Sequence, residues 1–272
     1  MKYEMLVLDL DGTLTNSKKE ITEPTRQALI EIQEAGKKVV LASGRPINGV
    51  QPLADKLLLD KFGSYILSFN GARITQCSTK QIIYNKTIPQ GVIESIYQIA
   101  KEYEHLGVDI ITYQDDDIIS GICPNEYTEK EKFINSMNIK RVENFPKYID
   151  FPVNKLLIPG EPKVLEEMME VLKEKFHTLL NIYRSEPFFL EVMPQKIDKA
   201  YTLQKLLSSI GLSADQMICC GDGYNDLSMI EYAGLGVAME NAQPIVKESA
   251  DYITKSNDED GVLYVINQFM RD

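Results

Sequence analysis

Short hydrophobic runs alternate with longer amphipathic segments through the first 70 residues of the chain. Buried strands are predicted where a short apolar run precedes polar or glycine-containing sequence, at residues 5–8, 38–42 and 65–69. After the first run, Thr22 with Pro24 is a typical helix start, and Gly36 is a typical helix end. Strand–helix–strand order with short connections predicts a parallel, doubly wound sheet.

The middle of the chain has a different pattern, in which pairs of short strands are separated by turn residues and flanked by helices. These features are hairpins of 108–113 with 117–122 and of 178–184 with 188–193, and helices at 88–104 and 162–176. Antiparallel hairpins beside helices indicate a separate α+β domain inserted into the parallel sheet.

The strand–helix alternation returns after this insertion. It predicts a helix at 198–210, a strand at 216–220, a helix at 225–233, a strand at 235–238 and a final helix that ends at Phe269. The fold class is therefore α/β, with a parallel-sheet core that is split by an α+β insertion. We assign residues 1–84 and 190–272 to the core and residues 85–189 to the insertion.

Composition and charge narrow the classes of partner. The 29 basic and 40 acidic residues give a net charge of −11, which argues against non-specific binding to nucleic acid or to an anionic membrane. An anionic substrate is still possible, because a metal ion can reverse the local potential. The chain starts without a signal-peptide pattern and has no apolar run approaching the roughly 18 residues that span a bilayer. The four cysteines lack metal-ligand spacing, so a reducing cytoplasm fits best.

Two carboxylates, Asp9 and Asp11, lie where the first strand meets a glycine-containing turn. Residues i and i+2 of a strand point to the same side, so both acids can face one pocket. Like charges this close need a cation or a shared proton, and carboxylate oxygens suit Mg²⁺. A carboxylate can also attack phosphorus as a nucleophile. The pair therefore indicates Mg²⁺-dependent phosphoryl chemistry, and the alternative is an ordinary polar β-turn.

Polar, glycine-containing sequence follows four of the predicted core strands. These stretches are Asp9–Thr13, Ser43–Arg45, Asn70–Gly71 and Gly221–Asp226. In open parallel sheets, ligands bind beyond the carboxyl ends of the strands, so we expect the four stretches to converge. Their convergence is more specific than any one motif.

Further candidates could complete such a site, and each has a simpler alternative. Asp222 could share a hard oxygen site with Asp9, while Asp226 could tune the metal through water or only favour a helix N-terminus. Ser43 could donate to a phosphate oxygen or act only as a helix N-cap. Lys199 could neutralise charge between nucleophile and phosphate, or lie solvated on the surface.

The motifs D-x-D-G-T, S-G-R-P, a lysine and G-D-G-x-N-D, in this order, resemble the haloacid dehalogenase superfamily of phosphohydrolases. The stretches Leu41–Pro46, Phe69–Ala72 and Gly221–Asp226, with an insertion before the lysine, are similar to its Cof-type sugar-phosphatase branch, subfamily IIB. The resemblance covers essentially the whole chain. It implies a Rossmann-like core with a mobile α+β cap of the C2B type.

The resemblance also implies roles for individual residues. Asp9 would become an aspartyl-phosphate, and Asp11 would be the general acid and base. Mg²⁺ would be held by Asp9, the backbone carbonyl of Asp11 and Asp222, with support from Asp226. Phosphate and substrate would be bound by Ser43, Gly44, Arg45, Asn70, Gly71, Lys199 and Asn225. The substrate would be a small phosphorylated metabolite, most simply a sugar phosphate.

The chain departs from the family pattern at two places. Ala200 follows Lys199 where the family usually has glycine, and Lys196 is a rival for the lysine role. Lys199 is preferred because it begins a helical pattern. Glu240 replaces a glycine in the family's G-V-A-M-G-N-A motif, so the geometry of that loop is in question. We expect no catalytic or metal role for His105 or His177, and we interpret Asp115–Asp117 as a solvated turn.

Three other functions remain as alternatives. A phosphomutase or phosphotransferase would use the same groups but pass the phosphoryl group to a sugar. A signalling receiver domain also uses an acid pair and a lysine, but it lacks the insertion and the late G-D-G-x-N-D motif. A non-catalytic sugar-phosphate-binding regulator is disfavoured, because every chemical group for catalysis is present. The sequence does not identify the physiological substrate or the oligomeric state.

Overall fold

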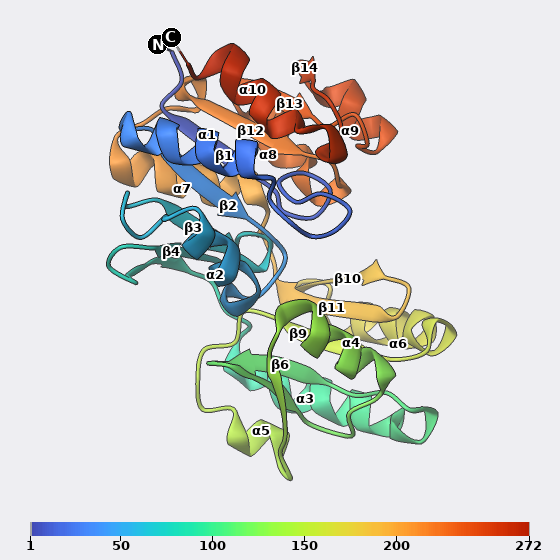
Figure 1. Cartoon of the computed structure of the whole chain (residues 1–272). Coiled ribbons are helices and arrows are strands. Elements are labelled where there is room, and N and C mark those ends of the chain that lie inside the picture. The colour runs from blue at the N-terminus through green and yellow to red at the C-terminus, as the bar shows by residue number, and fades with distance from the viewer. Residues whose placement is uncertain (1, 272) are drawn as a thin grey trace. The chain divides into compact units, whose positions relative to one another are not determined.

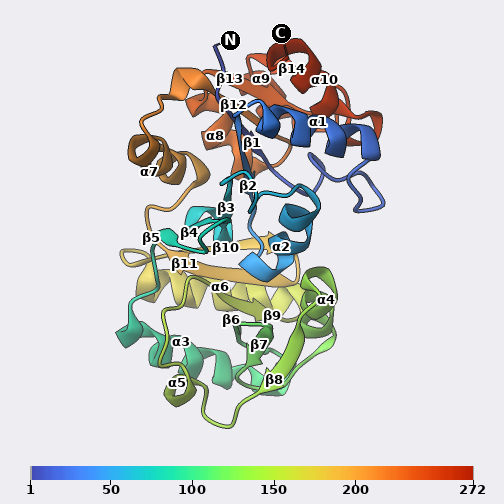
Figure 2. The same cartoon turned by 60° about the vertical axis from the view of Figure 1, so that its left-hand side comes forward.

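The computed structural model describes residues 2–271, which divide into two compact units. The first, called the core unit below, contains the described residues of Met1–Asn85 and of Asp198–Asp272. The second, called the inserted unit, is Lys86–Ile197. Each unit has its own sheet and its own hydrophobic core, and Figures 1 and 2 together label the strands and helices of each.

The core unit is built on an eight-stranded sheet in the order β14-β13-β12-β1-β2-β3-β4-β5. Neighbours from β14 to β3 pair in parallel, while β4 and β5 add an antiparallel edge. The central strands are apolar throughout, as expected for parallel strands that are buried on both faces. The strands are β1 (Met5–Leu8), β2 (Lys38–Ala42), β3 (Tyr65–Ser68), β4 (Arg73–Gln76), β5 (Ile82–Asn85), β12 (Met217–Gly221), β13 (Leu235–Ala238) and β14 (Tyr252–Ile253).

Helices cover both faces of this sheet, as Figures 1 and 2 show. Alternate residues of β1 belong to different clusters: Leu6 packs with α1, α2 and α10, and Val7 packs with α7. The helices are α1 (Glu23–Glu34), α2 (Ile47–Lys56), α7 (Lys199–Ile210), α8 (Leu227–Tyr232), α9 (Pro244–Ser249) and α10 (Gly261–Phe269). Short 3₁₀ turns lie at η1 (Phe69–Gly71), η3 (Ala214–Gln216), η4 (Tyr224–Asp226) and η5 (Asn257–Glu259). The predicted α/β fold with a parallel-sheet core is confirmed.

The inserted unit has a six-stranded sheet in the order β10-β11-β9-β6-β7-β8. All neighbours pair antiparallel except β7 and β8. The strands are β6 (Ile111–Gln114), β7 (Asp117–Ser120), β8 (Asn138–Arg141), β9 (Leu156–Pro159), β10 (Leu180–Glu186) and β11 (Phe189–Pro194). The two hairpins predicted in this region are therefore present, as β6 with β7 and β10 with β11.

One face of the second sheet carries the core of the inserted unit. Helix α6 begins at Pro162, and the missing N–H of proline costs no hydrogen bond there because the first turn of a helix has no intrahelical acceptor for it. The helix buries an apolar stripe at Leu165, Met168 and Leu172. Helix α3 buries Ile93 and Ile96 in the same cluster. The helices are α3 (Gln90–Glu102), α4 (Glu126–Asn135), α5 (Phe145–Tyr148) and α6 (Pro162–Phe176), with a 3₁₀ turn at η2 (Glu104–Leu106).

The second domain boundary predicted from the sequence is wrong by several residues. We assigned residues 190–197 to the core, whereas the structure places them in the inserted unit, which ends at Ile197. The reason is strand pairing, because β11 lies between β10 and β9 in the second sheet. Among residues 2–271, no helix has the length and apolar character needed to cross a bilayer.

Candidate functional site

The polar loops at the ends of β1, β2, β3 and β12 converge in the core unit. Because β12, β1, β2 and β3 are neighbouring parallel strands, their carboxyl ends lie at one edge of the sheet. Asp9 directly follows β1, and its backbone N–H donates to the Cys220 carbonyl on β12 at 3.1 Å. The sequence prediction that these strand ends form one site is in agreement with this arrangement.

Lys199 is at the centre of the site. Its ammonium group donates to Asp9 Oδ1 at 2.7 Å, to Asp226 Oδ1 at 2.6 Å and to the Ala42 carbonyl at 2.7 Å. The side chain is 1% exposed, which excludes the solvated-surface alternative. Burial alone would lower the pKa of Lys199, but the carboxylates of Asp226 and Asp9 raise it, so the amine is charged. Lys196, the rival, lies in the inserted unit.

Asp222 lies against the loop that follows β1. Thr13 Oγ1 donates to Asp222 Oδ1 at 2.8 Å, although the two residues are far apart in the sequence. Gly12 has a φ of +84°, and a Cβ atom there would lie 2.4 Å from Asp222 Oδ2. Only glycine allows this backbone conformation and this close approach together. Gly12 therefore brings the loop of the Asp9–Asp11 pair against the second acidic loop.

Asp9, Asp222 and Asp226 form a cluster in which one carboxylate oxygen of each lies within 4.8 Å of the others. Burial raises the pKa of Asp9 well above its usual range, and Asp226 and Asp222 raise it further, while Lys199 opposes them. Burial likewise raises the pKa of Asp222 to about 6. Within residues 2–271 nothing donates a hydrogen bond to Asp9 Oδ2 or to Asp222 Oδ2. The cluster has surplus negative charge and open hard oxygen atoms, which fits a divalent cation such as Mg²⁺.

Asp226 is fully buried, and both of its oxygen atoms have partners. Oδ1 accepts from Lys199, and Oδ2 accepts from the backbone N–H groups of Asp222 and Gly223 at 3.0 and 2.9 Å. Gly221 permits this packing, since a Cβ atom there would lie 2.4 Å from the Asp226 Cβ. Asp226 therefore fixes the acidic loop and Lys199 relative to each other, in addition to contributing charge. It precedes α8 but makes no side-chain capping hydrogen bond to it.

Asp11 does not share its carboxylate with this cluster. It accepts from Arg45 Nε and Nη2 at 2.9 and 2.7 Å, and from Lys19 Nζ at 2.8 Å. Burial favours the neutral acid, yet the charge of Arg45 and the hydrogen bond from Lys19 lower the pKa of Asp11. The two acids of the pair thus have different partners. Sequence reasoning did not identify Lys19, because nothing in its surface loop marks it as an Asp11 partner.

The other predicted residues surround this group. Ser43 is buried, and its hydroxyl accepts from the Arg45 N–H at 3.2 Å, which leaves its own proton able to donate. It does not cap α2, whose N-cap is Pro46. Asn70 Oδ1 accepts from Asn225 Nδ2 at 3.1 Å. Gly71, at a φ of +102°, packs against the start of α7, and its carbonyl accepts from Thr202 Oγ1 at 2.7 Å.

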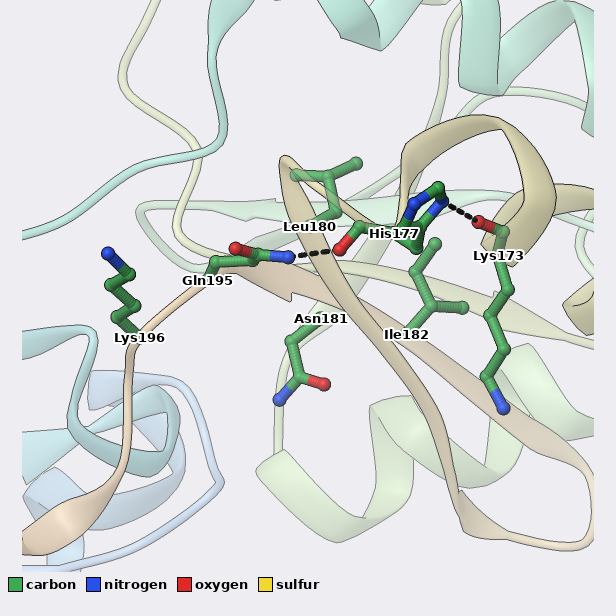
Figure 3. Close-up of a pocket in the computed structure, with 7 residues that line it drawn as sticks. All are labelled: Lys173, His177, Leu180, Asn181, Ile182, Gln195 and Lys196. Carbon is green, nitrogen blue, oxygen red and sulfur yellow. Dashed lines mark hydrogen bonds between the residues drawn. The ribbon is translucent and has the colours of Figure 1, made fainter.

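A separate hollow of about 380 Å³ lies within the inserted unit, and none of the predicted site residues lines it. Its walls are Lys173, His177, Leu180, Asn181, Ile182, Gln195 and Lys196. Figure 3 shows the two lysine ammonium groups at opposite sides and pointing apart, with the His177 ring turned towards the Lys173 carbonyl. The polar groups do not converge on one point. The chemistry of this chain is therefore better placed in the core unit.

Comparisons with known proteins agree with this geometry. The sequence pattern of the haloacid dehalogenase-like hydrolase family matches residues 6–266. The chain is 32% identical to the protein named "Putative phosphatase YxeH" of Bacillus subtilis strain 168, over 98% of both chains. A crystal structure of a haloacid dehalogenase-like hydrolase from Bacteroides thetaiotaomicron is 46% identical, with a TM-score of 0.94, over 98% of this chain and 99% of that one. The subclass IIB sugar phosphatase BT4131 is 28% identical, with a TM-score of 0.79, over the same shares.

Proposed function

The chain belongs to the haloacid dehalogenase-like hydrolase family, and from this premise we propose that it is a Mg²⁺-dependent phosphatase of small phosphorylated metabolites, most simply sugar phosphates. The observation that carries the proposal is the buried Lys199, which joins Asp9 and Asp226 beside Asp222. The sugar-phosphate class is supported by the similarity to BT4131. The inserted unit would then act as a cap that selects the leaving group.

Asp9 is the proposed nucleophile. Its carboxylate attacks phosphorus, the bond from phosphorus to the leaving oxygen breaks, and an aspartyl-phosphate forms. Lys199 holds Asp9 in place and offsets charge as the phosphoryl group approaches. Ser43 donates its hydroxyl proton to a phosphate oxygen, and Arg45, Gly44, Asn70, Gly71 and Asn225 form the surrounding surface for the substrate.

Asp11 is the proposed general acid and base. It protonates the leaving alcohol in the first step, and it takes a proton from the attacking water in the second. Arg45 grips both oxygen atoms of Asp11, which fixes the carboxylate beside the nucleophile loop. The lowered pKa of Asp11 suits the second step, in which an ionised carboxylate accepts the proton, whereas the first step requires Asp11 to carry a proton once the substrate is bound.

Mg²⁺ would be held by Asp9, Asp222 and the backbone carbonyl of Asp11, with Asp226 in support. Bound there, it would neutralise charge on the nucleophile and on the phosphate, so that two anions can meet. The full use of both Asp226 oxygen atoms by Lys199 and by backbone N–H groups favours an indirect role for Asp226.

A phosphatase screen tests the proposal. The purified chain is assayed for phosphate release from sugar phosphates, nucleotides and pyridoxal phosphate, with and without Mg²⁺. We expect Mg²⁺-dependent release from at least one sugar phosphate, and a loss of at least about 10⁴-fold in Asp9→Asn, since no nucleophile remains. Product analysis with an added acceptor sugar separates hydrolysis from phosphoryl transfer. Near-normal activity of Asp9→Asn, or inactivity of the native chain on every substrate, would contradict the proposal.

A further inference from the structure

The loop after β13 contains the family-like stretch whose glycine is replaced by Glu240, and the proposed mechanism gives this loop no role. Glu240 is not among the described residues with a positive φ, so the replacement does not strain the backbone. The loop makes contacts with both acidic loops of the site. Asn241 Nδ2 donates to the Gly12 carbonyl at 2.8 Å, and the Gln243 N–H donates to the Asp222 carbonyl at 2.9 Å.

The Asn241 side-chain amide is itself fixed by a second hydrogen bond, on its oxygen atom. Its Oδ1 accepts from the backbone N–H of Asn257 at 3.0 Å. The Asn257 side chain then donates to the Thr15 carbonyl at 2.9 Å. Both ends of the Asn241 amide are satisfied with the correct polarity, so its orientation is defined by its partners. Three segments that are distant in the sequence, at 12–15, 241–243 and 257, are thereby joined.

Gly12 lies in a turn that is closed by the hydrogen bonds from Leu14 N–H to the Asp9 carbonyl and from Thr15 N–H to the Leu10 carbonyl, and Asn241 adds a restraint from outside this turn. Gly12 directly follows Asp11, whose carbonyl is a proposed metal ligand, and it adopts a φ of +84° against Asp222. Glycine has the widest backbone freedom of any residue, so the conformation of this turn is not fixed by Gly12 itself. The hydrogen bond from Asn241 fixes the Gly12 carbonyl, and with it the peptide between Gly12 and Thr13, one residue beyond Asp11.

We propose that Asn241 is a positioning residue for the divalent-cation site, and that Asn257 supports it from the opposite side. The two side chains hold the Asp9–Asp11 loop, and the Gln243 N–H beside Asn241 holds the Asp222 carbonyl, so that the segment 241–243 sets the separation of the two acidic loops that Mg²⁺ requires. This inference rests on the proposed function, because it assumes that Asp9 and Asp222 bind Mg²⁺. It adds to that function by assigning part of the cation affinity to two asparagines that contact no proposed ligand side chain.

The test measures Mg²⁺ binding without substrate. The melting temperature of the full chain is recorded against Mg²⁺ concentration for the native protein, Asn241→Ala and Asn257→Ala, and the half-saturating Mg²⁺ concentration, called the Mg²⁺ midpoint below, is the dissociation constant fitted to the rise. Asn241→Ala loses the hydrogen bond to the Gly12 carbonyl and the one from the Asn257 N–H, so we expect its half-saturating Mg²⁺ concentration to rise about tenfold. Asn257→Ala loses only the bond to Thr15 and keeps its backbone N–H, so we expect a rise of about threefold.

Asn267→Ala is the matched control. It removes an exposed asparagine of α10 that accepts from Arg271 Nη1, outside the three joined segments. We expect its Mg²⁺ midpoint to equal that of the native chain. A general loss of stability would lower the melting temperature of a variant without moving its Mg²⁺ midpoint, and this result for Asn241→Ala would overturn the inference. If Mg²⁺ leaves the native melting temperature unchanged, the magnesium site itself is wrong, and the positioning role falls with it.

Discussion

Each unit of the molecule buries aspartate, but the two units do so in different ways. Asp109 of the inserted unit is fully buried and accepts four hydrogen bonds, from the N–H groups of Ile110 and Ile122 and from the hydroxyls of Ser120 and Thr128. Burial raises its pKa, and these four donors oppose the shift. Both carboxylate oxygen atoms of Asp109 thus have hydrogen-bond donors from within the inserted unit.

The acids of the core unit are not satisfied in this way. Asp9 and Asp226 share one buried lysine, the half-buried Asp222 lies beside them, and one oxygen atom each of Asp9 and Asp222 accepts nothing from residues 2–271. Three negative charges around one positive charge are costly in a buried place. Burial of an acid therefore does not by itself indicate chemistry. What distinguishes the core unit is an excess of charge and of open oxygen atoms that a cation would offset.

The largest effect is expected from removing the one buried cation of the core cluster. Lys199→Met leaves Asp9 and Asp226 buried without their partner, so we expect the free energy of unfolding to fall by about 3–5 kcal/mol and turnover to be lost. Urea unfolding and phosphate release measure the two effects. Lys205→Met on the exposed side of the same helix is the control, with an expected change below about 0.5 kcal/mol. A stable, active Lys199→Met protein would remove the basis of the comparison.

A smaller effect on the free energy of unfolding is expected from changing Asp109, whose oxygen atoms all have hydrogen-bond donors. Asp109→Ala leaves two backbone N–H groups buried without an acceptor, so we expect a loss of about 3 kcal/mol in the free energy of unfolding. Asp109→Asn should cost less, about 1 kcal/mol, because the hydroxyls of Ser120 and Thr128 can rotate to accept from the new amide. The turnover number of the folded protein should stay within about twofold of the native value. Lost turnover at normal stability would show that Asp109 has a chemical role as well.

The smallest stability change, of opposite sign, is expected from Asp222. Asp222→Asn removes one of the three clustered negative charges, so the melting temperature without metal should rise by about 2–4 °C. The same change removes a proposed metal ligand, so the stabilisation that Mg²⁺ gives the native chain should disappear. Thermal melts with Mg²⁺ and with a chelator measure both effects. A lower melting temperature without metal, or an unchanged response to Mg²⁺, would contradict the charge-excess argument.

The sequence predicted the parts of the site that depend on strand ends. The loops at Asp9, Ser43, Asn70 and Asp222 follow apolar runs, and parallel pairing brings the carboxyl ends of such runs to one edge. Lys199 was also predicted, because it begins a recognisable helix. These predictions needed only local patterns and the geometry of a parallel sheet.

Other features depend on contacts that no local pattern encodes. Lys19 meets Asp11 only because its surface loop folds back, and Asn241 meets Gly12 across 229 residues of sequence. The boundary of the inserted unit was misplaced because the predicted limit at residue 190 cut through the second strand of the predicted hairpin, which is β11 in the structure. The pairing of β11 with β9, which joins segments distant in the sequence, keeps the whole strand in the second sheet.

The most direct test of the account is chemical trapping of the intermediate on Asp9. The native chain is mixed with Mg²⁺ and a sugar phosphate that it hydrolyses, and borohydride is added during turnover. Borohydride reduces an acyl phosphate to an alcohol. Peptide mass spectrometry then identifies the modified residue. The account predicts homoserine at position 9, dependent on substrate and Mg²⁺. An unmodified Asp9 during active turnover, or reduction at Asp11 or Asp222 instead, would contradict it.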